Sequence, residues 1–229
     1  ERWVCAVELM TDEGLETERR EPFLKAPGSL LLLCALLAGS YAAEMWFGRD
    51  GAIAAFGFTQ EDLTGASWWR IFTALFVHAN LLHVVMNTGF VLALGGPPAR
   101  IFGPTWRGVA VFLGFFLVCG AIASLFHALI EQHGDWILVG ASGAAAGLFG
   151  ATARIIEGEG VVGPLLGRRF LGMAASWMAF NMIFLIPVVS DLLAGGPVSW
   201  QAHIGGFIAG ALLVGVFQRF AGGGTARGY

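Results

Sequence analysis

The stretch GASGAAAGLFGA, residues 140–151, lies in an apolar run that begins near Trp136 and holds one polar side chain, Ser142. Glycine and alanine flank this serine on both sides. In a membrane, small residues let neighbouring helix backbones approach closely, and a lone hydroxyl among them is shielded from water. The stretch therefore predicts a tightly packed helix that carries one chemically distinctive group.

The composition indicates that the solvent around this helix is partly lipid. Of 229 residues, 56% are hydrophobic and 13% are charged, whereas soluble domains carry about 25% charged residues. So few charges cannot cover a water-facing surface, which predicts an integral, multi-pass membrane protein. The net charge of −3 says little about partners, and the sequence has no basic block that would suggest nucleic acid. The three widely spaced cysteines predict neither a disulfide framework nor a metal site, and we expect no cofactor.

Six apolar segments, most of them within or near the length of a spanning helix, predict an all-α fold of six transmembrane helices. They cover residues 27–47, 71–96, 108–130, 136–153, 170–189 and 200–217. The fourth is short, which suits a helix buried among its neighbours. We expect residues 1–26 to form a mobile cytoplasmic tail, residues 27–220 to form the transmembrane domain, and residues 221–229 to form a short tail.

Lysine and arginine predict the orientation. If the N-terminus lies inside, all of the 13 Lys and Arg residues except Arg49 and Arg70 fall in inner connections. Positive charge marks the cytoplasmic side, so we expect both termini to be cytoplasmic. The first outer connection, residues 48–69, ends beside Trp69 and Arg70, an aromatic ring and a cation that suit the headgroup layer. This loop is expected to lie in the membrane interface.

Polar side chains within apolar segments are functional candidates, because lipid penalises them. Four of them fall in the outer halves of three segments, within a few turns of one surface: His83, Asn87, Ser142 and His203. His83 and Asn87 are four residues apart and share a helix face, and His78 lies nearer the outer end. We expect Asn181 to make an interhelical hydrogen bond, and His127 and His133 to be solvated at segment ends.

This set predicts nucleophilic catalysis. A serine hydroxyl attacks an amide only when a base such as neutral imidazole accepts its proton, and the resulting oxyanion needs positioned donors. No Asp or Glu lies at the depth of His203, so the arrangement predicted is a Ser–His dyad. Glycines leave one face of the fourth segment and one of the sixth nearly bare, so that these helices are expected to pack closely: Gly140, Gly143, Gly147, Gly150, Gly206 and Gly210.

Four motifs in order resemble the rhomboid family of intramembrane serine proteases over roughly residues 67–217. They are Trp69-Arg70, the set His78/His83/Asn87, Gly140-Ala141-Ser142-Gly143, and Ala202-His203 with Gly206 and Gly210. The resemblance implies a six-helix bundle whose short fourth helix lifts the serine into a water-filled cavity. It also implies cleavage of single-span membrane proteins in or beside their spanning helix.

By the same resemblance, Ser142 is the nucleophile and His203 the general base. His83, Asn87 and the backbone N–H of Ser142 would stabilise the oxyanion, with His78 assisting at the rim. The Ala and Gly richness suggests a bacterial plasma membrane.

One departure from the family bears on activity. Many relatives have an aromatic residue four positions after the serine, beneath the histidine ring, and this chain has Ala146 there. Another group must therefore orient His203. The departure keeps open a catalytically silent, rhomboid-like protein that binds membrane clients. A transporter or channel is a weaker alternative, because the sequence shows no relay of intramembrane acids and no inverted repeat.

Overall fold

The structure is a computed structural model that describes residues 26–131 and 136–222. The predicted tails, residues 1–26 and 221–229, therefore lie almost wholly outside the described residues. The predicted orientation of the termini stays a prediction.

Within the described residues, every regular element is helical, which confirms the all-α prediction. The elements are α1 (Gly28–Phe47), α2 (Arg49–Phe56), η1 (Gln60–Leu63), α3 (Arg70–Thr73), η2 (Ala74–Phe76), α4 (Leu81–Leu94), α5 (Gly96–Phe102), α6 (Trp106–Ile130), α7 (Ser142–Glu157), α8 (Arg168–Ile183), α9 (Pro187–Ala194) and α10 (Trp200–Phe220). Each apolar segment of the sequence overlaps at least one of them.

Side-chain caps fix where three of the helices begin. Asn80 accepts a hydrogen bond from the backbone N–H of His83 at 2.7 Å before α4. Ser199 does the same for Ala202 at 3.1 Å before α10, and Thr105 caps α6. Such caps satisfy N–H groups that have no partner within the helix. Two of the three caps lie directly before helices that carry candidate site residues.

The described residues contain three helices that are long and apolar enough to cross a membrane by themselves: α1, α6 and α10. Two further segments are bent pairs, α3–η2 with α4 at 98° and α8 with α9 at 94°. Pro187 at the first position of α9 explains the second break, because proline cannot continue the preceding helix. If each bent pair is one span, the number rises to five.

The fourth apolar segment differs from its prediction. Residues 136–141 are not helical, and α7 begins only at Ser142. Leu138 instead pairs with Phe58 through two backbone hydrogen bonds of 3.0 and 2.7 Å. Gly140 then takes a φ of +101°, which a helix does not contain. This turn sets the serine at the first residue of the helix rather than two turns inside it.

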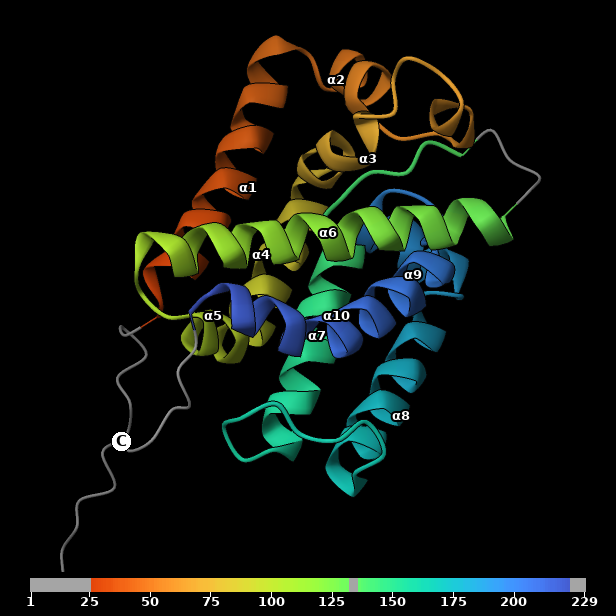
Figure 1. Ribbon diagram of the computed structural model, residues 1–229. Coiled ribbons are helices and arrows are strands. Elements are labelled where there is room, and N and C mark those ends of the chain that lie inside the picture. The colour runs from red at the N-terminus through yellow and green to blue at the C-terminus, as the bar shows by residue number, and fades with distance from the viewer. Residues whose placement is uncertain (1–25, 132–135, 223–229) are drawn as a thin grey trace, which may run out of the picture.

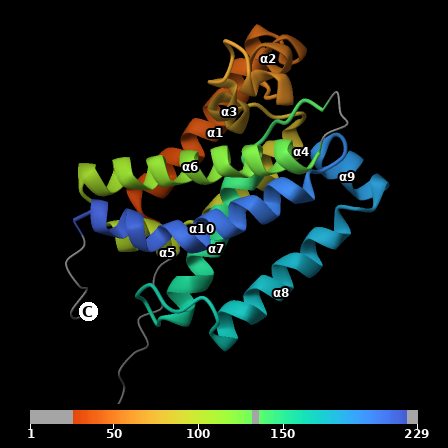
Figure 2. The same ribbon diagram turned by 45° about the vertical axis from the view of Figure 1, so that its right-hand side comes forward.

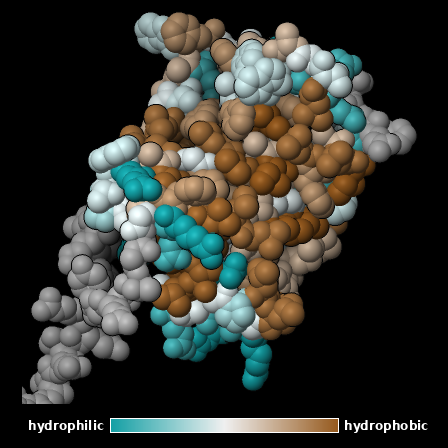
Figure 3. All heavy atoms as spheres, viewed as in Figure 1, coloured by the Kyte–Doolittle hydropathy of each residue, from teal (hydrophilic) through white to brown (hydrophobic). Residues whose placement is uncertain are grey.

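The short helix α7 lies at the centre of the bundle. It contacts α4, α5, α6, α8 and α10, and it packs most extensively against α10. Figures 1 and 2 show α6 and α10 side by side and crossed by α7, with α8 at the edge of the bundle. Large apolar side chains are exposed on the outside, among them Trp106, Leu129 and Val188. Apolar residues cover most of the middle of the face seen in Figure 3, as lipid contact requires.

Candidate active site

Ser142 is the first residue of α7 and is half-buried. The first N–H groups of a helix have no intrahelical partner, and the helix dipole makes this end partly positive. The serine hydroxyl therefore lies beside backbone donors that favour negative charge. Those donors are what a developing oxyanion next to Ser142 needs.

Gly140 brings the backbone before Ser142 against two side chains of α4. A Cβ atom built on Gly140 would lie 2.6 Å from His83 Nε2 and 3.3 Å from Asn87 Nδ2. Both side chains are buried, and Asn87 Nδ2 has no hydrogen-bond partner among the described residues. The bare Cα of Gly140 therefore keeps two potential donors close to the serine.

His203 lies in the first turn of α10 and is buried. Its Nδ1 is hydrogen-bonded to Asn181 Oδ1 of α8, and its Nε2 has no partner among the described residues. Hydrogen bonds between the described residues do not include one from Ser142 Oγ to His203. The free nitrogen of the ring is the atom that a general base would use.

Ser142 and His203 line one small cavity of about 30 Å³, enough for a water molecule. His83 and Asn87 line the same cavity, so α4, α7 and α10 each contribute to it. The remaining wall is apolar and includes four aromatic side chains: Phe90, Trp177, Phe180 and Phe184. The four polar side chains that the sequence placed at one depth thus surround a common space.

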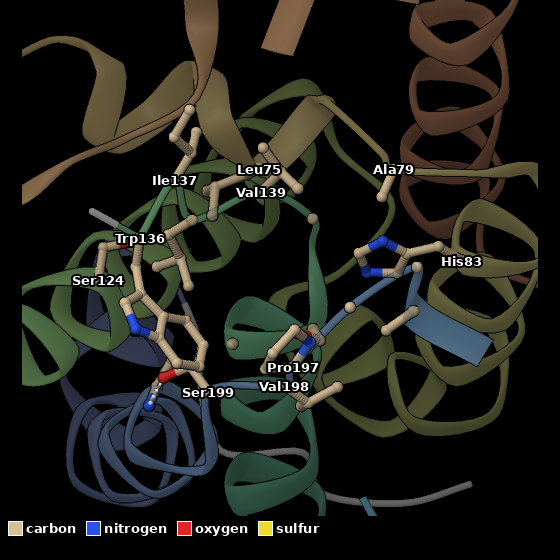
Figure 4. A pocket seen from close by; sticks show the side chains of 18 of the residues that line it. Leu75, Ala79, His83, Ser124, Trp136, Ile137, Val139, Pro197, Val198 and Ser199 are labelled. Carbon is tan, nitrogen blue, oxygen red and sulfur yellow. Dashed lines mark hydrogen bonds between the residues drawn. The ribbon is translucent and has the colours of Figure 1, made fainter. Parts of the chain in front are cut away.

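Ser142 and His83 also line a larger cavity of about 520 Å³. Figure 4 shows His83 on one side of this cavity and Trp136, Ser124 and Ser199 on the other. The segment 194–199, from the last residue of α9 to the residue before α10, forms part of its wall. A cavity of this volume is in the range of ligand sites, and it reaches the serine.

His78 lies behind His83 rather than in the cavities. It is fully buried, its ring centroid is 5.2 Å from that of His83, and both of its ring nitrogens lack a partner among the described residues. Its backbone N–H donates to Glu44 Oε2 of α1 at 3.2 Å. His78 is not among the residues that line either cavity, and its ring packs against the His83 ring, which does line them.

Glycines form the contact between α7 and α10. A Cβ on Gly206 would lie 2.0 Å from the carbonyl oxygen of Gly143, and one on Gly210 would lie 1.8 Å from that of Gly147. Side chains at these positions would collide with backbone, so the two helices approach as closely as their backbones allow. Ser142 directly precedes Gly143, and His203 lies three residues before Gly206.

Trp69 and Arg70 lie away from the cavities, next to the connection between α2 and α3. Arg70 pairs with Asp62 at 3.4 Å, and its guanidinium lies 5.7 Å from the centre of the Trp69 ring. Asp62 also accepts the backbone N–H and the hydroxyl of Thr59. These contacts order the connection, and Trp68 is 60% exposed beside them.

Two groups near the site have partners that the sequence did not specify. Asn181 makes the expected interhelical hydrogen bond, and its partner is His203. The prediction that His127 is solvated is wrong, because it is buried and 2.7 Å from Ser199 Oγ. Gln201 and Glu131 extend this network at 3.1 Å. His133 lies outside the described residues.

Metal-ligating side chains do not gather elsewhere in the part of the chain that the structure describes. No group of three or more His, Cys, Asp or Glu residues there has the arrangement of a metal site. The described cysteines, Cys34 and Cys119, are free.

Comparison with known families identifies one match. A family model described as the Rhomboid domain matches residues 65–220, which is more than half of the chain. The matched region begins before Trp69 and ends with α10, so it contains every candidate site residue and all the residues that line the two cavities except Ile53.

Individual relatives agree over a similar stretch. RHOMBOID-like protein 6, mitochondrial, of Arabidopsis thaliana is 32% identical over 152 residues, 65% of this chain and 43% of that protein. Rhomboid-like protease 3 of Toxoplasma gondii is 29% identical, over 64% of this chain and 50% of that protein. Inactive RHOMBOID-like protein 8 of Arabidopsis thaliana is 30% identical, over 66% of this chain and 41% of that protein. The chain thus spans half or less of these relatives' lengths.

Proposed function

The chain belongs to the rhomboid family of membrane proteins, and on that premise we propose that it is a serine endopeptidase that hydrolyses peptide bonds in or beside transmembrane segments. One observation carries the proposal: the nucleophile and base candidates, Ser142 and His203, line the same small cavity with His83 and Asn87. The relative from Toxoplasma gondii is named a protease, which supports the same activity.

The chemistry follows the atoms that face this cavity. His203 Nε2 accepts the proton of Ser142 Oγ while Oγ bonds to the carbonyl carbon of the scissile amide. The protonated ring then gives this proton to the leaving amine, and an acyl ester remains on Ser142. Water, activated by the same ring, hydrolyses the ester and frees the serine.

The oxyanion of each tetrahedral intermediate would form beside Gly140. The donors nearest to that place are Asn87 Nδ2, the His83 ring and the first N–H groups of α7. In a site shielded from bulk water, each such donor is worth more than it is in water. His78 supports this set indirectly, by packing its ring against His83.

The substrates that we propose are single-span membrane proteins, because the cavity lies in a bundle whose outer surface is apolar. The lipid bilayer is then a partner as well. We propose that it contacts the exposed apolar side chains of the bundle, and Trp68 and Trp69 beside α3. A bacterial plasma membrane, with both termini cytoplasmic, remains our expectation for its location.

The test compares three purified proteins in detergent: the parent, Ser142→Ala and Ser176→Ala. Ser176 is exposed on α8 and bonds only its own helix, so it is a matched serine away from the cavities. Ser142→Ala should cut a single-span substrate at least about 10³-fold more slowly and should not react with a serine-directed phosphonate. Equal cleavage by Ser142→Ala and the parent would refute the proposal.

A second candidate is a catalytically silent protein that binds membrane clients. Ala146 lies where many rhomboid proteases have an aromatic residue, and one relative is named inactive. For this candidate, a client would co-purify equally with the parent and with Ser142→Ala, and neither would cleave it or react with the phosphonate.

A further inference from the structure

Asn181 of α8 makes two hydrogen bonds, and together they fix which way its amide group faces. Its Nδ2 donates to the carbonyl oxygen of Trp177, one turn earlier, at 2.8 Å. Its Oδ1 is the atom that meets His203 Nδ1. An amide nitrogen only donates and a carbonyl oxygen only accepts. Because Trp177 accepts, the Asn181 atom bonded to it must be Nδ2, and the atom that faces His203 must be Oδ1.

The second bond in turn fixes the proton on the imidazole. Because Asn181 Oδ1 only accepts, His203 Nδ1 must carry the hydrogen. In the neutral ring, Nε2 is then the unprotonated nitrogen, with its lone pair free. That atom is buried without another partner among the described residues, and the ring lines the cavity that Ser142 also lines.

The rings that pack against His203 also come from α8 and from Phe184, the residue directly after it. The centroid of Trp177 lies 5.9 Å from that of His203, and Phe184 lies 6.5 Å away at an angle of 83°. Ala146 is fully buried in a cluster with Trp177. The support that an aromatic residue at position 146 would give is therefore supplied from a different helix.

We propose that Asn181 is a positioning residue that holds His203 in the tautomer with hydrogen on Nδ1, so that Nε2 faces the reaction as a base. The proposal rests on the proposed function for its effect on rate, but the tautomer exists whether or not a substrate is cleaved. A buried asparagine thus occupies the place where a Ser–His–Asp triad has its acid.

Kinetics separate this role from a structural one. Asn181→Leu keeps the size but removes the acceptor, so kcat should fall about 10²-fold with little change in KM. Asn181→Asp restores an acceptor and should recover much of kcat. Its carboxylate also stabilises protonated imidazole, so the acidic limb of the kcat/KM profile should move to higher pH. Met182→Leu, an exposed neighbour on α8, is the matched control and should behave like the parent.

A merely structural Asn181 gives a different pattern. Asn181→Asp would then be no better than Asn181→Leu, and neither variant would alter the pH profile of the remaining activity. Either result would overturn the proposal.

A spectroscopic measurement tests the tautomer without turnover. Nitrogen NMR of histidine-labelled protein, with the His203 signals assigned by their loss in His203→Ala, reports which ring nitrogen carries hydrogen. The parent should show Nδ1 protonated and Nε2 bare, and Asn181→Leu should show a mixture of tautomers. A parent with hydrogen on Nε2, or an Asn181→Leu spectrum equal to the parent's, refutes the role of Asn181. A correct tautomer in a parent that cleaves nothing refutes only the proposed function.

Discussion

Gly140 affects the candidate site in two ways, through its backbone conformation and through its lack of a side chain. Its φ of +101° disfavours any residue with a Cβ, and its missing Cβ leaves room for His83 and Asn87. The backbone strain of a substitution and its collision with neighbouring side chains are separate effects. Other glycines of the chain have a positive φ but open space around them.

We predict that Gly140→Ala both destabilises and inactivates the protein. The backbone strain should cost about 1–3 kcal/mol, and the new methyl group must displace the His83 ring or the Asn87 amide. Gly48→Ala is the matched control, since Gly48 has a φ of +104° with open space around it. Thermal unfolding should shift for both variants, while cleavage should collapse only for Gly140→Ala. Comparable cleavage by the two variants would show that the contact with α4 does not matter.

Asn87 gives a second prediction at this scale. Asn87→Leu keeps the volume but removes Nδ2, so kcat should fall about 10²–10³-fold if this amide donates to the oxyanion. Thr88→Val, the next residue on α4, makes a similar exchange of a polar for an apolar group outside the cavities. Steady-state kinetics on one substrate compare Asn87→Leu with Thr88→Val. If Asn87→Leu raised KM and left kcat unchanged, Asn87 would have a role in substrate binding instead.

How far the site could be read from the sequence depends on the kind of contact. The depth of Ser142, His203, His83 and Asn87 follows from topology and helix period, and both are visible in a sequence. The partner of Asn181 depends on how α8 is rotated and bent, which only tertiary packing decides. The burial of His127 was missed for the same reason, because its cover comes from Ser199, Gln201 and Glu131, which are distant or loop residues.

At the scale of elements, the residue at which α7 begins could not be predicted from the local sequence pattern. Residues 136–141 are as apolar as the helix that follows, so composition predicts one continuous helix. Leu138 pairs instead with Phe58, and the N–H of Gly140 donates to the carbonyl oxygen of Ala74 at 2.8 Å. These partners are far away in sequence. They pull the chain into an extended form and leave Ser142 at a helix end.

The contact between α7 and α10 makes a prediction about stability. Gly206→Ala and Gly210→Ala place a methyl group against backbone carbonyl oxygens, which cannot move aside as a side chain would. Each should destabilise the protein by about 1–3 kcal/mol and slow cleavage, because separating the helices also moves His203 from Ser142. Gly215→Ala, on the same helix, has its nearest atom at 3.7 Å and should be tolerated. Unfolding by heat in detergent and cleavage assays on the folded fraction measure both effects.

At the scale of the whole molecule, residues 194–199, at the end of α9 and after it, form part of the wall of the larger cavity and cover it there. Helix α9 lies against α4, and the loop 194–199 lines the cavity next to Ser142. Gly195, with a φ of +78°, lies so close to the residues before α4 that a Cβ on it would be 3.0 Å from Ala79 Cβ. If a transmembrane substrate reaches Ser142 past the start of α4, as we propose, this contact has to open.

We therefore predict that a disulfide between Ala79→Cys and Gly195→Cys blocks membrane substrates. Disulfides span Cβ atoms about 3.5–4.5 Å apart, so the pair needs a shift of only a fraction of an ångström. The oxidised double variant, with Cys5 replaced by Ser, should cleave a single-span protein more slowly than its reduced form. Its reaction with a small phosphonate should persist, because Ser142 and His203 would still line the same small cavity. Gly195→Cys alone controls for strain at the positive φ. If oxidation leaves cleavage of the membrane substrate unchanged, the substrate enters without separating α9 from α4, and the cover is only a passive wall.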